Sequence, residues 1–162
     1  MPDSSSFTMI LILVLLVILS GYFSATETAF TSLNRIRLKS KADAGNRRAA
    51  LALRLVDQYD NLLSTILVGN NIVNLSASSL ATVFFTEGLR LQNGAVVSTA
   101  VITIVVLVFG EVSPKSLAKE YPESFAMFSA PIMRILMTIL TPVNFLFSLL
   151  KKLLSKMFHR EG

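Results

Sequence analysis

The sequence contains no cysteine, and its only histidine is His159. Without cysteine the chain can form neither a disulfide nor a thiolate metal site, and it has no cysteine nucleophile. A single histidine near the C-terminus excludes a histidine-ligated zinc site and a Ser-His-Asp triad. The sequence therefore offers no convincing pair of nucleophile and base, and we do not expect an enzyme.

Charged side chains are scarce as well. Asp, Glu, Lys and Arg make up 15% of the 162 residues, whereas a soluble domain has about a quarter. Apolar residues make up 52%, and the missing charge is concentrated in long uncharged blocks. This composition indicates an integral membrane protein, and the length allows a single transmembrane domain over residues 1–162.

The formal net charge of +5 is unevenly distributed, because seven of the fifteen basic residues lie between Arg35 and Arg54. In a membrane protein such a cluster marks the cytoplasmic side of the adjoining span. A nucleic-acid-binding surface would need basic residues interleaved with aromatic ones on a soluble module. The sequence has no such module, so we expect no nucleic-acid partner.

Three almost uncharged stretches are long enough to cross a bilayer, which takes about 20 apolar residues. We expect spans at about 7–30, 61–86 and 91–114, and a pair of short cytoplasmic helices at about 33–60. A cleaved signal peptide is the alternative for the first stretch. A signal peptide would have a basic start and a shorter apolar run, so we favour a retained span.

The region at about 124–157 admits two interpretations. A fourth span would bury Arg134, at a cost of at least about 2.5 kcal/mol, and would place the basic residues from Lys151 onward outside, against the positive-inside rule. We favour an amphipathic juxtamembrane helix, bent at Pro142, that lies on the inner interface in contact with membrane lipids.

The predicted fold is therefore all-α and integral to the membrane, with three transmembrane helices, a cytoplasmic-side helical pair and an amphipathic juxtamembrane helix. The residues before the first span carry no Lys or Arg. We expect a multi-pass protein of the cell (inner) membrane, with its N-terminus outside and its basic loop and C-terminus in the cytoplasm.

The third span ends in Val108-Phe109-Gly110-Glu111-Val112-Ser113-Pro114-Lys115. A carboxylate in a span is costly and suggests a function. Pro114 cannot donate its N–H and crowds the carbonyl four residues back, that of Gly110. The sequence predicts a broken helix that presents the bare Gly110 carbonyl beside the Glu111 carboxylate, an arrangement that commonly coordinates small cations. The alternative is an interfacial carboxylate capped by Lys115.

The first two spans carry further oxygen donors. Ser24 and Thr28 share one helical face, as do Asn70 and Asn74, because each pair is four residues apart. Hydroxyl, amide, carbonyl and carboxylate oxygens without nitrogen or sulfur donors suit Mg²⁺, Ca²⁺ or Na⁺. The alternative is that these side chains only join helices by hydrogen bonds, and Gly21 and Gly69 are expected to allow close helix packing.

Three motifs in order, Gly21–Ala29, Gly69–Asn74 and Phe109–Lys115, resemble the membrane domain of the CorC and cyclin-M (CNNM) family of magnesium transporters. The resemblance covers about residues 7–157. It implies a homodimer of three-span protomers that exports Mg²⁺ in a sodium-dependent manner by alternating access, holding a largely dehydrated ion.

Carried over by this resemblance, Ser24 would bind the metal through its hydroxyl, Asn70 through its amide oxygen, Gly110 through its main-chain carbonyl and Glu111 through its carboxylate. Thr28 and Asn74 would bind Mg²⁺ or serve Na⁺. Family members continue into paired cystathionine-β-synthase-type domains that bind ATP. These cytoplasmic regulatory domains are missing from the 162 residues, so nucleotide regulation is not expected of them.

The competing class is a structural or assembly membrane protein, in which the polar intramembrane residues only hold helices together. It predicts that Mg²⁺ does not change the thermal stability of the protein. The transporter hypothesis instead requires the three polar clusters to meet in one place.

Overall fold

The structure, a computed structural model, describes residues 4–160. Every regular element within this range is a helix, with π-helical segments labelled η: α1 (Ser4–Ser32), α2 (Arg35–Asp43), α3 (Arg47–Asp57), α4 (Tyr59–Val83), η1 (Phe84–Gly88), α5 (Gly94–Val105), η2 (Val106–Val112), α6 (Ser113–Glu120), α7 (Pro122–Ile139) and α8 (Thr141–Arg160).

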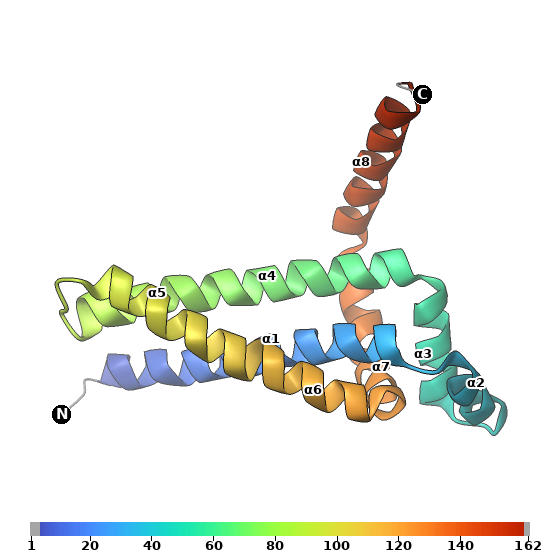
Figure 1. The fold of residues 1–162 in the computed structure, drawn as a ribbon, viewed down its shortest axis with the longest axis horizontal. Coiled ribbons are helices and arrows are strands. Elements are labelled where there is room, and N and C mark those ends of the chain that lie inside the picture. Colours follow the sequence, from blue (N-terminus) through green and yellow to red (C-terminus); the bar gives the residue numbers. More distant parts are fainter. Residues whose placement is uncertain (1–3, 161–162) are drawn as a thin grey trace.

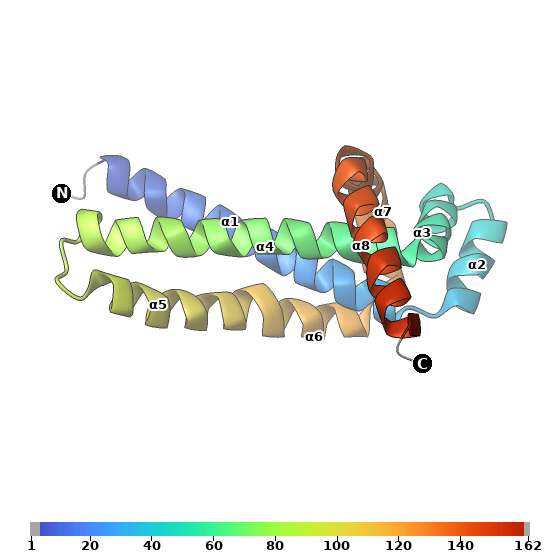
Figure 2. The same cartoon turned by 90° about the horizontal axis from the view of Figure 1, so that it is seen from above.

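Three long helices run side by side in Figures 1 and 2: α1, α4 continued by η1, and α5 continued by η2 and α6. Each is long and apolar enough to cross a membrane. The predicted all-α membrane fold with three spans is thus confirmed, and the chain is a multi-pass membrane protein. The short helices α2 and α3 lie at one end of this bundle, which we call the basic end.

The two halves of α1 differ in burial. The first half exposes large apolar side chains such as Phe7, Leu11 and Ile18, as expected for a helix surface that faces lipid. The second half is buried around most of its circumference, and its buried residues include Ser20, Gly21, Phe23, Ser24, Ala25, Thr26, Thr28, Ala29 and Phe30. The other spans and α7 pack against α1.

Asparagine side chains start both helices of the short pair. Asn34 accepts a hydrogen bond from the backbone N–H of Ile36, and Asn46 accepts one from that of Arg48. These caps satisfy backbone donors that have no partner in the first helical turn. Gly45 lies in the turn between the helices with a φ of 100°, a conformation that glycine adopts without strain.

The juxtamembrane region differs from the prediction of one helix bent at Pro142. It forms two helices, α7 and α8, that meet at Leu140 with a bend of 74°. Pro142 is the second residue of α8, where its missing N–H costs no helical bond. The break therefore falls before the proline. Both helices run across the direction of the spans at the basic end (Figures 1 and 2).

Gly69 allows α1 and α4 to approach closely, as the sequence predicts. A Cβ atom at this position would lie 2.5 Å from the nearest ring atom of Phe23, which is itself buried. We therefore expect Gly69→Ala to force the two helices or the ring apart. Such overpacking typically costs about 1–3 kcal/mol of stability.

This prediction is checked by thermal unfolding of the purified protein in detergent. Gly69→Ala should lower the Tm, and adding Phe23→Leu should restore part of the loss. Gly88→Ala is the matched control, because the nearest atom to its new Cβ would lie 3.4 Å away. An unchanged Tm for Gly69→Ala would contradict the close approach of α1 and α4.

Candidate cation site

Side chains of α1 and α4 meet in a cluster of three oxygen atoms. The hydroxyl of Ser20, which is 1% exposed, donates a hydrogen bond to Oδ1 of Asn74 at 2.7 Å. The same hydroxyl oxygen lies 3.4 Å from Oδ1 of Asn70. Asn70 and Asn74 are one turn apart on α4, so both amides reach the same part of α1.

The oxygens of this cluster keep unused acceptor capacity. A serine hydroxyl has one proton, and the 2.7 Å contact to Asn74 uses it. Asn70 Oδ1 is then held only by long contacts, including one of 3.4 Å from Nδ2 of Asn74. At that distance a hydrogen bond is weak. The arrangement can therefore turn lone pairs toward a small cation at low cost.

The third span reaches the same cluster through Gly110. This residue is buried in η2, and a Cβ atom on it would lie 2.9 Å from the hydroxyl oxygen of Ser20. Only a residue without a side chain permits this approach. Main chain from the third span therefore lies against side chains from the first two.

The third span is continuous, which corrects the prediction of a broken helix. A π-helical segment, η2, joins α5 to α6, and the N–H of Ser113 bonds to the carbonyl of Val108, five residues back. In that register Pro114 would pair with Phe109, but proline has no N–H. In this register Pro114 leaves the carbonyl of Phe109 without its helical donor.

The Phe109 carbonyl faces α1 at Gly21. A Cβ atom on Gly21 would lie 3.2 Å from this oxygen and 3.0 Å from Cγ of Pro114. Gly21 thus allows the close packing that the sequence predicts for it. π-Helical segments are rare overall, and those that occur are often found at functional sites. This one brings the backbone of Phe109 and Gly110 against Gly21 and Ser20 of α1.

The remaining predicted ligands lie outside the hydrogen-bonded cluster. Ser24 and Thr28 are buried one and two turns after Ser20 on α1, away from the Ser20–Asn74 hydrogen bond. Glu111 is half-buried and makes no ion pair within residues 4–160, where the ion pairs are Arg35–Asp57 and Lys151–Asp60. Capping of Glu111 by Lys115 is therefore not observed.

Ser20 is the residue that sequence reasoning missed. It lies four residues before Ser24, so Ser20, Ser24 and Thr28 form one polar line along α1. Extending the Ser24–Thr28 face by one turn toward the N-terminus would have found it. In the described part of the chain, no group of three or more His, Cys, Asp or Glu side chains could hold a metal, so a cation here would depend mainly on neutral oxygens.

Comparison with known proteins gives consistent matches. Residues 11–162 match the family described as the cyclin M transmembrane N-terminal domain. A UPF0053 protein of Haemophilus influenzae is 40% identical over 147 residues, which cover 90% of this chain and 34% of the relative. The UPF0053 inner membrane protein YfjD of Escherichia coli is 40% identical over 141 residues, which cover 86% and 32%.

A more distant match is a chloroplastic DUF21 domain-containing protein of Arabidopsis thaliana. It is 31% identical over 138 residues, which cover 83% of this chain and 20% of the relative. The chain thus spans about a third of the length of the two bacterial relatives and a fifth of the plant one.

The hydrogen bond between Ser20 and Asn74 should appear as a coupling energy in a double-mutant cycle. We expect Ser20→Ala and Asn74→Ala to be coupled by about 0.6 kcal/mol, the average found between membrane helices, and by no more than about 1.7 kcal/mol. The measurement is reversible unfolding in mixed detergent micelles. The control cycle pairs Ser20→Ala with Asn71→Ala, because Asn71 is exposed and should show no coupling. Equal coupling in both cycles would contradict the cluster.

Proposed function

The chain belongs to the family of cyclin M transmembrane N-terminal domains, and we propose that it carries Mg²⁺ across the membrane through the cluster of Ser20, Asn70 and Asn74. One observation carries the proposal. Three side-chain oxygens from two spans converge where the backbone of the third span arrives at Gly110. Oxygen donors alone are what Mg²⁺ prefers.

The spacing of these oxygens supports a shared coordination sphere. Neighbouring ligands of an octahedral ion with bonds of about 2.1 Å lie roughly 3.0 Å apart. The distances from Ser20 Oγ to the Oδ1 atoms of Asn74 and Asn70 are 2.7 and 3.4 Å, which bracket this value. Small rotations of the three side chains would bring them to adjacent corners of one octahedron.

The remaining residues take supporting roles in this proposal. Glu111 supplies the negative charge of the site. Because it is the only charged ligand, the affinity for Mg²⁺ stays low enough for the ion to be released. Ser24 and Thr28 continue the line of hydroxyl groups along α1 from Ser20 toward the basic end. They would accept the ion as it moves to or from that side, and Thr28 would bind the coupling Na⁺. The π-helical segment η2 would allow the third span to shift register between states.

The orientation and assembly of the protein form part of the same proposal. The concentration of Lys and Arg in α2 and α3 favours a cytoplasmic basic end, with export from that side. Large apolar side chains of the first half of α1 and of α5 are exposed, among them Leu11, Ile18, Val96 and Ile104. A second copy of the chain would cover part of this surface in a homodimer.

The site is tested by measuring Mg²⁺ efflux from liposomes that contain the purified full chain and are loaded with Mg²⁺. Ser20→Ala, Asn70→Ala, Asn74→Ala and Glu111→Gln should each slow efflux about 10-fold or more, because an interaction with a charged group contributes about 1.5–3 kcal/mol. Asn71→Ala should keep the normal rate, since this neighbouring amide is exposed.

Wild-type efflux rates in all four variants would exclude this site. A different outcome, in which the wild-type protein itself showed neither Mg²⁺ efflux nor a Tm shift with Mg²⁺, would favour the structural or assembly role. The Tm measurement separates loss of the site from loss of the fold, because a folded variant still unfolds in one cooperative transition without Mg²⁺.

Sodium coupling is tested by replacing external Na⁺ with N-methyl-D-glucamine. We expect Mg²⁺ efflux to fall to the background rate, and Thr28→Ala to raise the Na⁺ concentration that gives half-maximal efflux. Thr31→Ala is the control, because Thr31 is an exposed threonine of the same helix. Efflux that continues unchanged without Na⁺ would show that another gradient drives transport.

A further inference from the structure

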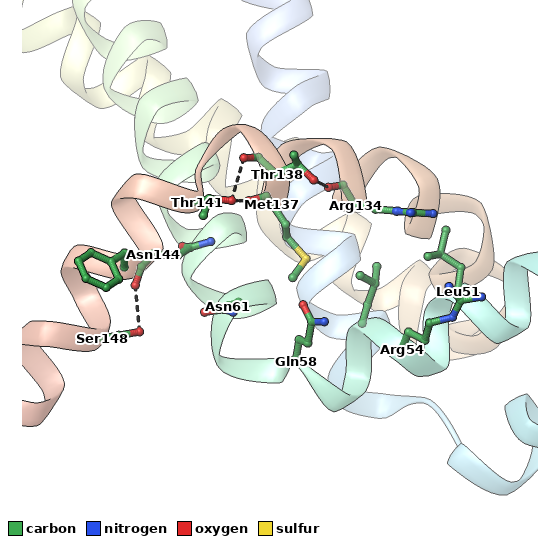
Figure 3. Close-up of a pocket in the computed structure, with 12 residues that line it drawn as sticks. Leu51, Arg54, Gln58, Asn61, Arg134, Met137, Thr138, Thr141, Asn144 and Ser148 are labelled. Carbon is green, nitrogen blue, oxygen red and sulfur yellow. Dashed lines mark hydrogen bonds between the residues drawn. The ribbon is translucent and has the colours of Figure 1, made fainter.

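A groove of about 510 Å³ lies at the basic end, where α3, α4, α7 and α8 meet. In Figure 3, Arg54 and Arg134 lie at one end of the groove, and Asn61, Asn144 and Ser148 lie at the other. Apolar side chains, including Leu55, Met137 and Phe145, line the space between and beside them. The groove is separate from the cluster around Ser20, and its role does not depend on the transport proposed above.

The arginine end carries positive charge that the protein does not neutralise. Arg54 of α3 and Arg134 of α7 are both exposed, and no acidic side chain lines the groove. The ion pairs within residues 4–160 use Arg35 and Lys151 instead. Two guanidinium groups from different helices attract an anion, and their planar geometry matches a phosphate group.

Asn144 lines the opposite end of the groove, and its side chain holds a buried acceptor without a donor. Asn144 is 6% exposed, and its Nδ2 donates to the hydroxyl oxygen of Thr65 at 3.1 Å. The Thr65 hydroxyl gives its own proton to the carbonyl of Asn61 at 2.8 Å, so it can only accept from Asn144. The amide orientation is thereby set, and Asn144 Oδ1 has no partner in the described part of the chain. Buried polar atoms are normally paired.

The two ends together define the chemistry of a ligand. It must carry a phosphate for the arginines and, toward the other end of the groove, a hydroxyl or other donor for Asn144. It must also tolerate the apolar wall formed by Met137 and Phe145. Phosphocholine has no donor, and phosphoethanolamine has no net negative charge to offset the two arginines. A phosphoglycerol headgroup meets each requirement.

The position of the groove indicates where this headgroup comes from. Helices α7 and α8 run across the spans at the basic end, and α8 exposes large apolar residues such as Leu150 and Phe158 beside Lys151 and Lys152. An amphipathic helix of this kind lies in the membrane interface. Basic pockets between helices at that level bind anionic lipid headgroups.

We propose that this groove is a binding site for the phosphoglycerol headgroup of an anionic membrane lipid. Arg54 and Arg134 bind the phosphate, and a glycerol hydroxyl donates to Oδ1 of Asn144. The bound lipid would join α3, α7 and α8 at the interface, with its acyl chains along the apolar face of α8.

The experiment titrates the purified full chain, in a neutral detergent, with dioctanoyl phosphatidylglycerol and counts bound lipid by native mass spectrometry. Arg54→Gln with Arg134→Gln should weaken the Kd at least 10-fold. The matched control is Arg47→Gln with Arg48→Gln, which removes the same charge from exposed positions of the same end and should change the Kd less than twofold. Equal weakening by both pairs would overturn the site.

Three further ligands test whether the phosphoglycerol group belongs to a lipid or to a soluble compound, and what Asn144 contributes to binding. Dioctanoyl phosphatidic acid, which lacks the glycerol hydroxyls, should bind several-fold more weakly, and Asn144→Leu should abolish this preference. Dioctanoyl phosphatidylcholine should bind most weakly. If sn-glycerol 1-phosphate bound as tightly as the lipid, the groove would serve a soluble phosphate ester and the lipid assignment would be wrong. The arginine variants decide the case even if Asn144→Leu fails to fold, because both arginines are exposed.

Discussion

A polar side chain inside a bilayer must find its partners within the protein, and this constraint sets how the three spans meet. The second half of α1 carries the polar line of Ser20, Ser24 and Thr28, which would be costly against lipid. Burial of that line requires α4 and the third span to approach α1 at van der Waals distance. Gly69 and Gly110 make the approach possible, since a Cβ atom at either would collide with α1.

The π-helical segment η2 follows from the same packing. Proline in an α-helix crowds the carbonyl four residues back and usually kinks the helix. Here one wider turn before Pro114 keeps the third span continuous, and in that register Pro114 supplies no donor to the carbonyl of Phe109. The span therefore presents main-chain atoms to α1 without a break that would expose further polar groups to lipid. The close approach of Gly110 to Ser20 lies within this wider stretch of helix.

The juxtamembrane helices are tied to the spans by buried hydrogen bonds. The Tyr22 hydroxyl lies 2.6 Å from that of Ser129 on α7, which is also 3.0 Å from the Thr26 hydroxyl. Asn144 of α8 donates to Thr65 of α4. A movement of α1 or α4 would therefore be transmitted to α7 and α8. The groove proposed to hold a lipid headgroup lies between these linked helices, so a bound lipid would resist that movement.

The sequence by itself determined which stretches cross the membrane and that their polar residues offer only oxygen ligands. It also determined that Ser24 shares a helical face with Thr28, and Asn70 with Asn74. Hydropathy and helical periodicity are local properties, so the sequence carries them directly. Only the tertiary structure decided that Ser20 is the residue of α1 that bonds to Asn74, that Pro114 frees the carbonyl of Phe109, and that the juxtamembrane bend falls at Leu140. The rotation and axial offset of one helix against another depend on contacts between residues far apart in the chain, and periodicity within a helix carries no record of them.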